Sequence, residues 1–287
     1  MPYAPLLTPY ADDAPCPRVE VYFASFAPGT DTVTVTRTAG GRQYDVQGAK
    51  RASTAGALSR IDYECPLNEV VVYRAEMFDA AGQSLGFTDT ATLGEEAEGV
   101  GLISEDTWVH PALNPSRAAK VELAASTGAS LSRPVPGEIS YPIGRSVGVL
   151  LTEPRRGLTA FQFDVRATTL ESADTIQAMI GGYTIKTIPT LCIRPGLKDR
   201  GLRIPRPLFL GVLDIAEVGL NVRWGGSDTL QHMVGDEVEA PLRAVFIPLL
   251  TAADLNAFYA TAADLISDNA TAAAVNRRYD LAGYASA

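Results

Sequence analysis

Short runs in which apolar and polar residues alternate constrain this chain more than any other feature. In the stretch Ile61–Gln83, IDYECPLNEVVVYRAEMFDAAGQ, the residues Ile61, Tyr63 and Cys65 alternate with acidic residues. A period of two is typical of a half-buried β-strand. Pro66 and Asn68 then favour a turn, and Val70–Phe78 is rich in the β-branched and aromatic residues that strands prefer. The stretch therefore predicts two strands joined by a turn.

Similar runs surround this stretch on both sides. They are Val19–Phe26, Thr32–Thr38, Gln43–Gln47 and Ser84–Leu93, and glycine and proline separate them. Six or seven short strands at this spacing, without a helical period, predict an antiparallel sandwich. We expect this first domain to occupy residues 18–93. Residues 1–17 are rich in proline, and we expect them to form an extended arm rather than a packed element.

The rest of the chain divides into three expected segments. Residues 94–103 are rich in glycine and glutamate and predict a linker; a solvated loop within one large β domain is the alternative. Residues 104–250 predict a β-barrel or sandwich with one packed helix, Leu170–Ile180, which we expect Thr168 and Glu171 to cap. Further strands are expected at residues 120–124, 137–141, 146–152, 159–166, 190–194, 208–218 and 237–249.

Residues 251–287 predict a C-terminal helical segment. Thr251 can cap a helix in which apolar residues recur at helical spacing. We expect this stripe to pack on its own domain or to contact a neighbouring subunit. The candidate inter-subunit contacts are Leu255, Phe258, Tyr259 and Leu265.

Composition and charge exclude several classes of function. The net charge of −9 argues against a general nucleic-acid binder, which needs clustered lysine and arginine. No run of apolar residues is long enough to span a membrane, and we expect no secretory signal at the N-terminus. The cysteines Cys16, Cys65 and Cys192 are widely spaced and odd in number, so we expect neither a disulfide framework nor a zinc site, and synthesis in a reducing cytoplasm.

One motif is associated with catalysis. Residues Gly144–Gly148 match G-x-S-x-G, the turn that presents the nucleophile of serine hydrolases. That turn must follow a strand and open a helix, whereas the residues after Ser146 favour a strand and Pro154 ends it. We therefore expect no catalytic activity. An esterase would need a helix after Ser146 and His232 beside it.

The other chemically active side chains have simpler explanations. His110 and His232 are expected to be core or solvated residues rather than metal ligands, and Trp108 and Trp224 to be packed rather than stacked on a sugar. The acidic cluster Asp236, Glu237 and Glu239 is expected to be a solvated strand edge. The basic segments Arg155–Arg156 and Arg200–Arg206 are expected to pair with carboxylates of another subunit. No cofactor or metal is expected.

Residues 62–93, DYECPLNEVVVYRAEMFDAAGQSLGFTDTATL, resemble a fibronectin type III-like module. Together with VTVTRTAGGRQYDVQGAK before them, they resemble the modules at the start of minor tail proteins of actinobacterial siphophages. The segments WVHP (108–111), GRSVGVLLTEPRRG (144–157) and LTAADLNAFYATAADL (250–265) are similar to other parts of such proteins.

This resemblance implies a structural protein of the virion tail, made in the host cytoplasm and placed at the tail tip. Its partners would be other tail proteins and its own copies, in a homo-oligomeric ring with six-fold symmetry favoured over three-fold. The alternative is a carbohydrate-binding adsorption protein that contacts the host cell wall. An exposed aromatic platform would favour that alternative, and a ring-forming surface would favour the tail protein.

Overall fold

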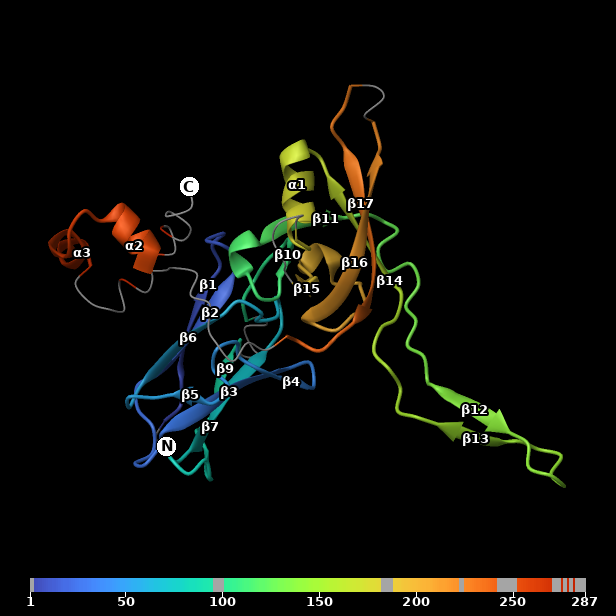
Figure 1. The fold of residues 1–287 in the computed structure, drawn as a ribbon, viewed down its shortest axis with the longest axis horizontal. Helices are drawn as coiled ribbons and strands as arrows, with labels where there is room; N and C mark the ends of the chain where they lie inside the picture. The colour runs from blue at the N-terminus through green and yellow to red at the C-terminus, as the bar shows by residue number, and fades with distance from the viewer. Residues whose placement is uncertain are drawn as a thin grey trace.

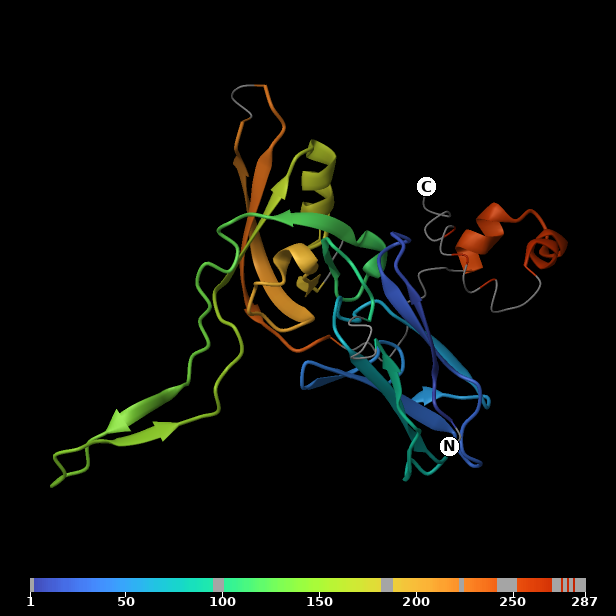
Figure 2. The ribbon, with the colours of Figure 1, turned by 180° about the vertical axis from the view of Figure 1, so that it is seen from behind.

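The chain forms a mainly β structure, as the sequence predicts, with two β domains and a helical segment at the C-terminal end (Figures 1 and 2). A computed structural model describes residues 3–94, 101–181, 188–221, 225–241 and 252–269, together with Val275, Arg278 and Leu281. No helix in these ranges is long and apolar enough to cross a membrane.

The first domain consists of two antiparallel sheets that pack on a common core. One sheet has the order β1-β2-β6 and the other the order β4-β3-β7-β8, with β5 beside β3 and β9 beside β7. The strands are β1 (Leu6–Tyr10), β2 (Arg18–Phe23), β3 (Thr32–Ala39), β4 (Arg42–Asp45), β5 (Ala52–Ser53), β6 (Leu58–Asp62), β7 (Val71–Phe78), β8 (Ser84–Phe87) and β9 (Ala91–Leu93). This is the sandwich that the alternating runs predict.

Side-chain alternation explains how these strands share one core. Val19, Val21 and Phe23 on β2 face Val33 and Val35 on β3, and all five side chains are fully buried. Since successive residues of a strand point to opposite faces, each run contributes its apolar half to the space between the sheets.

The sandwich begins earlier than the sequence predicts. Residues 6–10, expected to be an arm outside the packed domain, form β1 and pair with β2 in antiparallel register, Leu6 with Tyr22 and Tyr10 with Arg18. Proline is compatible with a strand at the edge of a sheet, where its missing N–H is not needed, and β1 is such an edge. The expected linker also ends early, because Leu102 is buried in the sandwich core; residues 95–100 lie outside the described residues.

The second domain is a closed six-stranded barrel with the order β10-β11-β14-β17-β16-β15. Its strands are β10 (Thr107–Pro111), β11 (Ala119–Leu123), β14 (Phe161–Ala167), β15 (Thr190–Arg194), β16 (Leu208–Gly219) and β17 (Thr229–Glu237), and two 3₁₀ turns lie at Pro115–Arg117 and Leu197–Asp199. The sequence predicts all of these strands except β10 and β17. It places the last strands at residues 237–249, of which residues 242–249 lie outside the described residues.

Helix α1 (Leu170–Ala178) packs on this barrel through Ala173 and Ile176, as expected. Its N-cap is Thr169 rather than Thr168. The Thr169 side chain accepts a hydrogen bond from the Ser172 backbone N–H, and the Ser172 hydroxyl lies 3.3 Å from the Thr169 backbone nitrogen. Both Thr168–Glu171 and Thr169–Ser172 have the spacing of a capping box, so spacing alone did not identify the first helical residue.

Within residues 252–269, the structure has two short helices where the sequence predicts one continuous helix. Helix α2 (Ala252–Phe258) ends before Tyr259, and α3 (Ala262–Asp268) begins after its own N-cap, Thr261. The Thr261 hydroxyl accepts from the Asp264 N–H at 3.2 Å, and a threonine that caps a new helix interrupts the preceding one.

A two-stranded hairpin, β12 (Gly137–Ser140) and β13 (Val149–Thr152), is inserted between β11 and β14. Figures 1 and 2 show it far from the barrel, at the end of two extended segments. No side chain from residue 132 to residue 157 is buried. We call residues 132–157 the projecting hairpin.

Candidate functional site

The G-x-S-x-G motif lies at the tip of the projecting hairpin. Ser146 is exposed, the Arg145 N–H donates to the Pro142 carbonyl at 3.1 Å, and the chain continues into strand β13. A nucleophile turn needs a helix directly after the serine, and here a strand follows. His232 belongs to β17 of the barrel, and Figure 1 shows β17 far from β12 and β13. The geometry that an esterase would require is therefore not assembled around Ser146.

His232 has a partner that the sequence analysis did not identify. Its Nδ1 donates to Asp164 Oδ1 at 2.6 Å, because β14 and β17 place the two residues opposite each other. Ser126 and Gln162 also donate to this carboxylate. Burial raises the pKa of Asp164, but these hydrogen bonds more than offset it and hold the pKa below its usual value. The cluster fixes the turn at Ser126 to the barrel wall.

His110 is a core residue, as the sequence predicts. Its side chain is fully buried, with Nδ1 3.0 Å from the Pro111 carbonyl oxygen and Nε2 3.3 Å from that of Tyr63. Burial and the charge of Arg194 lower its pKa to about 4. Within the described ranges, no three His, Cys, Asp or Glu side chains come together as a metal site.

The acidic cluster on β17 connects parts of the chain. Asp236 is exposed, as predicted, whereas Glu237 is partly buried, so the prediction of a solvated strand edge is wrong for Glu237. Asp236 accepts from the Ala160 N–H at 2.8 Å. Glu237 accepts from the Leu158 N–H at 2.9 Å and from Arg42 Nη1, on the first domain, at 2.6 Å. These carboxylates accept hydrogen bonds from other parts of the same chain. The run of acidic residues therefore does not indicate a surface that is free to bind a partner.

The two basic segments have different surroundings. Arg206 pairs with Glu69 of the first domain at 3.3 Å, so this arginine uses a carboxylate of its own chain rather than one of another subunit. Arg155 and Arg156 are exposed at the base of the projecting hairpin, where Arg155 Nε donates to the Arg133 carbonyl.

The tryptophan that the structure describes is not available to stack on a sugar. Trp108 is 3% exposed, belongs to the core of the first domain, and donates through Nε1 to Ser104 Oγ at 3.2 Å. Trp224 lies outside the described residues.

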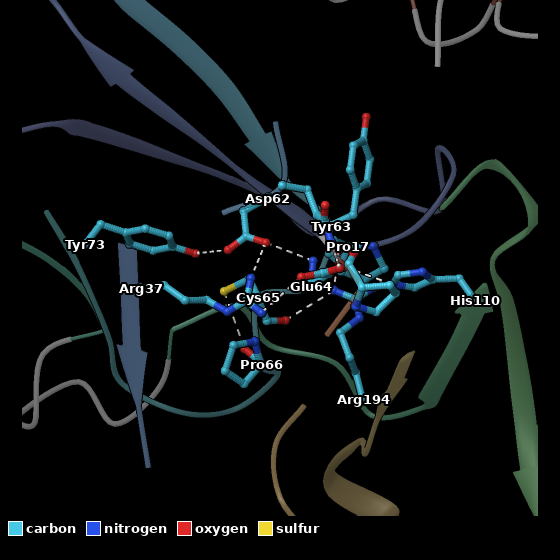
Figure 3. A network of polar contacts seen from close by, with 12 residues as sticks. Pro17, Arg37, Asp62, Tyr63, Glu64, Cys65, Pro66, Tyr73, His110 and Arg194 are labelled. Atoms are coloured by element: carbon cyan, nitrogen blue, oxygen red, sulfur yellow. Dashed lines mark hydrogen bonds and ion pairs between the residues drawn. The ribbon is translucent and has the colours of Figure 1, made fainter. Parts of the chain in front are cut away.

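The most unusual polar site is a buried charge cluster at the junction of the two domains (Figure 3). Arg37 Nη1 donates to Asp62 at 2.6 Å, Arg37 Nη2 donates to Glu64 at 3.3 Å, and the Tyr73 hydroxyl donates to Asp62 at 2.9 Å. All four side chains are almost completely buried. Buried charges are stable only when they are paired, and here one guanidinium serves two carboxylates.

The cluster contradicts the prediction that Asp62 and Glu64 are the solvated half of a strand. Strand β6 ends at Asp62, and the chain then turns inward, so the acidic residues face the core. Desolvation raises the pKa of Glu64 to about 7, although the Arg37 charge opposes this. The one sequence signal is Arg37, the single charged residue in the strand TVTVTRTA of β3.

A residue of the second domain also binds the backbone beside this cluster. Arg194 on β15 is fully buried and donates from Nη1 to the carbonyl oxygens of Pro17 at 2.7 Å and Cys65 at 3.2 Å. A smaller cluster beside it contains Ala112, Cys192 and Phe209, with Tyr44 packed against Phe209. All three cysteines are buried thiols. The two β domains therefore form a continuous packed unit rather than two modules on a flexible linker.

The projecting hairpin carries a large exposed apolar surface. Ile143 is fully exposed and Val147 is 75% exposed at the tip. The strands and flanking segments expose further large apolar side chains, which are Val135, Ile139, Tyr141, Val149, Leu150 and Leu151. So many large exposed apolar side chains on one short segment indicate a binding site. The sequence pattern did not reveal it, because these runs look like ordinary strands.

The predicted inter-subunit contacts lie in the two C-terminal helices and, for Tyr259, directly after α2. Phe258 is 42% exposed, whereas Leu255, Tyr259 and Leu265 are partly buried. Tyr259 participates in a local network, since its hydroxyl donates to Asp268 and accepts from Asn269. These contacts connect the two helices to each other; whether the four residues contact another subunit stays a prediction.

Comparison of the chain with known protein families, with curated proteins and with solved structures finds no match.

Proposed function

We propose that this protein is a structural component of a bacteriophage virion: a minor tail protein at the tail tip that assembles as a ring with other tail proteins. Six copies are favoured over three. The observation that carries this proposal is the projecting hairpin, which exposes apolar side chains along its whole length and makes no core of its own. A part that is shaped in this way functions when another protein covers it.

The rigid body behind the hairpin supports the same proposal. A ring needs subunits whose contact surfaces keep a fixed relative orientation, because small angular errors prevent closure. The sandwich and the barrel share Trp108 in one core, and Arg194 bonds across their junction. This packing would keep the hairpin at a constant angle to the rest of the subunit.

The proposal is tested on purified particles of the phage that encodes the chain. Antibodies raised against the full-length protein should label the distal end of the tail, and mass spectrometry should find the chain in the particle. Absence of the chain from purified particles would contradict the proposal. Labelling of side fibres, with retention of the isolated protein on host cell-wall polysaccharide, would favour the carbohydrate-binding alternative instead.

A further inference from the structure

The projecting hairpin cannot be explained as a self-sufficient part of the fold. Strands β12 and β13 pair only with each other in the described structure, and a two-stranded hairpin alone in water is marginally stable. Its apolar side chains lie on both strands and at the tip. A covering surface would remove them from water and stabilise the hairpin as well as the contact.

The charge of the hairpin narrows the choice of partner. Residues 132–157 contain four arginines and two glutamates, within a chain whose net charge is −9. Arg145 lies beside the apolar tip, and Arg155 and Arg156 lie at the base. The partner surface should therefore be apolar and acidic.

The chain itself has such a surface on β16 and β17. In the described part of the chain, β16 pairs with β15 only as far as Gly211, and beyond that point it pairs with β17 alone. This outer half exposes Leu213 and Val218 of β16, Leu220 directly after that strand, and Val234 of β17. Residues 212–219 of β16 carry two carboxylates, Asp214 and Glu217, and no basic residue, and Asp214 is next to Leu213. We call this surface the acidic strip.

We infer that the projecting hairpin of one copy docks on the acidic strip of a second copy of this chain. Both surfaces expose apolar side chains, and their charges are opposite in sign, basic on the hairpin and acidic on the strip. A chain does not cover its own strip, because Figures 1 and 2 show the hairpin and the outer ends of β16 and β17 projecting from the barrel in different directions. A contact between two different surfaces of identical chains repeats from subunit to subunit and closes into a ring when the rotation permits.

This inference deepens the proposed function and rests on it for the presence of a second copy. The test uses two full-length variants, Ile143→Cys on the hairpin and Leu213→Cys on the strip. The native thiols Cys16, Cys65 and Cys192 are buried, so a short bismaleimide reacts with the introduced cysteines. We expect crosslinks when the two variants are mixed. In the control mixture, Leu85→Cys replaces Leu213→Cys. Leu85 is an exposed leucine on β8 of the first domain, and this mixture should give no crosslink.

Charge reversal distinguishes this contact from non-specific apolar association. Adding Arg145→Glu to the hairpin variant, or Asp214→Lys to the strip variant, should each lower the crosslink yield roughly tenfold, and mixing the two reversed chains should restore it. Higher salt should lower the yield of the unreversed pair.

Three outcomes would overturn the inference: crosslinks between two hairpins only, equal yield in the Leu85→Cys control, or no crosslink in the mixture. If this crosslink is absent but the chain still sediments as oligomers, the inferred contact between hairpin and strip is wrong. The proposal of a ring, built through other surfaces, would then survive. Labelling of particles tests the tail-tip location independently of these results.

Discussion

At the residue scale, one arginine of the first domain organises the buried charge cluster beside the domain junction. Arg37 is fully buried with Asp62 and Glu64, and Tyr73 donates to the same Asp62 carboxylate. Removing one partner of such a group leaves an unpaired buried charge, which costs about 3–5 kcal/mol. The cluster therefore specifies how the turn after β6 enters the core more than it adds to stability.

The pKa of Glu64 gives this cluster a pH dependence. Because its pKa in the folded protein is about 7, above the ordinary value of 4.5, the folded state binds more protons than the unfolded state between these values. The contribution of Glu64 to the free energy of unfolding should be largest at pH 5 or below and fall as the pH rises to about 7. Glu64→Gln should therefore lose less stability than the wild type between pH 5 and pH 8.

Urea denaturation at several pH values between 5 and 8 measures this difference. The pKa of His110 is about 4 in the folded protein, below its ordinary value of 6.5. His110 therefore raises the free energy of unfolding as the pH rises between these values, and it does so in both proteins. Glu171→Gln, an exposed carboxylate on α1, is the matched control. Identical pH slopes for the wild type and Glu64→Gln would show that Glu64 is ionised throughout this range.

At the scale of elements, the strands are predictable where alternation and burial agree. Phe161, Phe163 and Val165 of β14 alternate in the sequence and are buried in the barrel. Strand β17 was missed because TLQHMVGDE contains few β-branched residues; its place is fixed by pairing with β14 and β16. Tertiary contacts of this kind override local propensity. The same reasoning explains β1, whose one proline, Pro9, is acceptable because β1 is an edge strand that pairs only with β2.

The candidate surface was less predictable than the fold. The runs that form β12 and β13 have ordinary strand character, and exposure depends on whether a third strand lies beside them. The buried cluster was hidden for a related reason, since Asp62 and Glu64 alternate with apolar residues as a solvated face would. Periodicity identifies an element, whereas its environment depends on residues far away in sequence.

Helix α1 provides a direct test of which threonine is the N-cap. Thr169→Ala removes the acceptor for the Ser172 N–H and should lower the free energy of unfolding by about 1 kcal/mol. Thr168→Ala, the matched control at the neighbouring position, should change it by only a few tenths of a kcal/mol. Thermal denaturation of both variants measures the difference, and a larger loss for Thr168→Ala would assign the cap to that residue.

The projecting hairpin should be dispensable for folding. Replacing Gly137–Thr152 with Asn-Gly is sterically simple, because the Glu153 N–H already donates to the Pro136 carbonyl at 2.9 Å. No buried side chain is lost, so the melting temperature should stay within about 4 °C of the wild type. Phe163→Ala, in the barrel core, should cost about 3–5 kcal/mol by comparison. A shortened chain that fails to fold would show that the hairpin belongs to the folding unit.

At the scale of the whole molecule, the chain combines a rigid body with one uncovered extension. The sandwich and the barrel share a core at Trp108 and a salt bridge at Arg42 and Glu237. The basic, apolar hairpin leaves this body, and the acidic strip lies elsewhere on it. Identical subunits with two complementary surfaces assemble head to tail, and closing a ring makes individually modest contacts stable.

Electron cryo-microscopy of intact particles tests this central claim most directly. The density at the tail tip should contain a ring of six copies of this chain, with each hairpin seated on the β16 and β17 strands of a neighbouring copy. Three copies in the same head-to-tail contact would change the symmetry but keep the contact. Copies that project singly as fibres, with hairpins that touch no other copy of the chain, would contradict it.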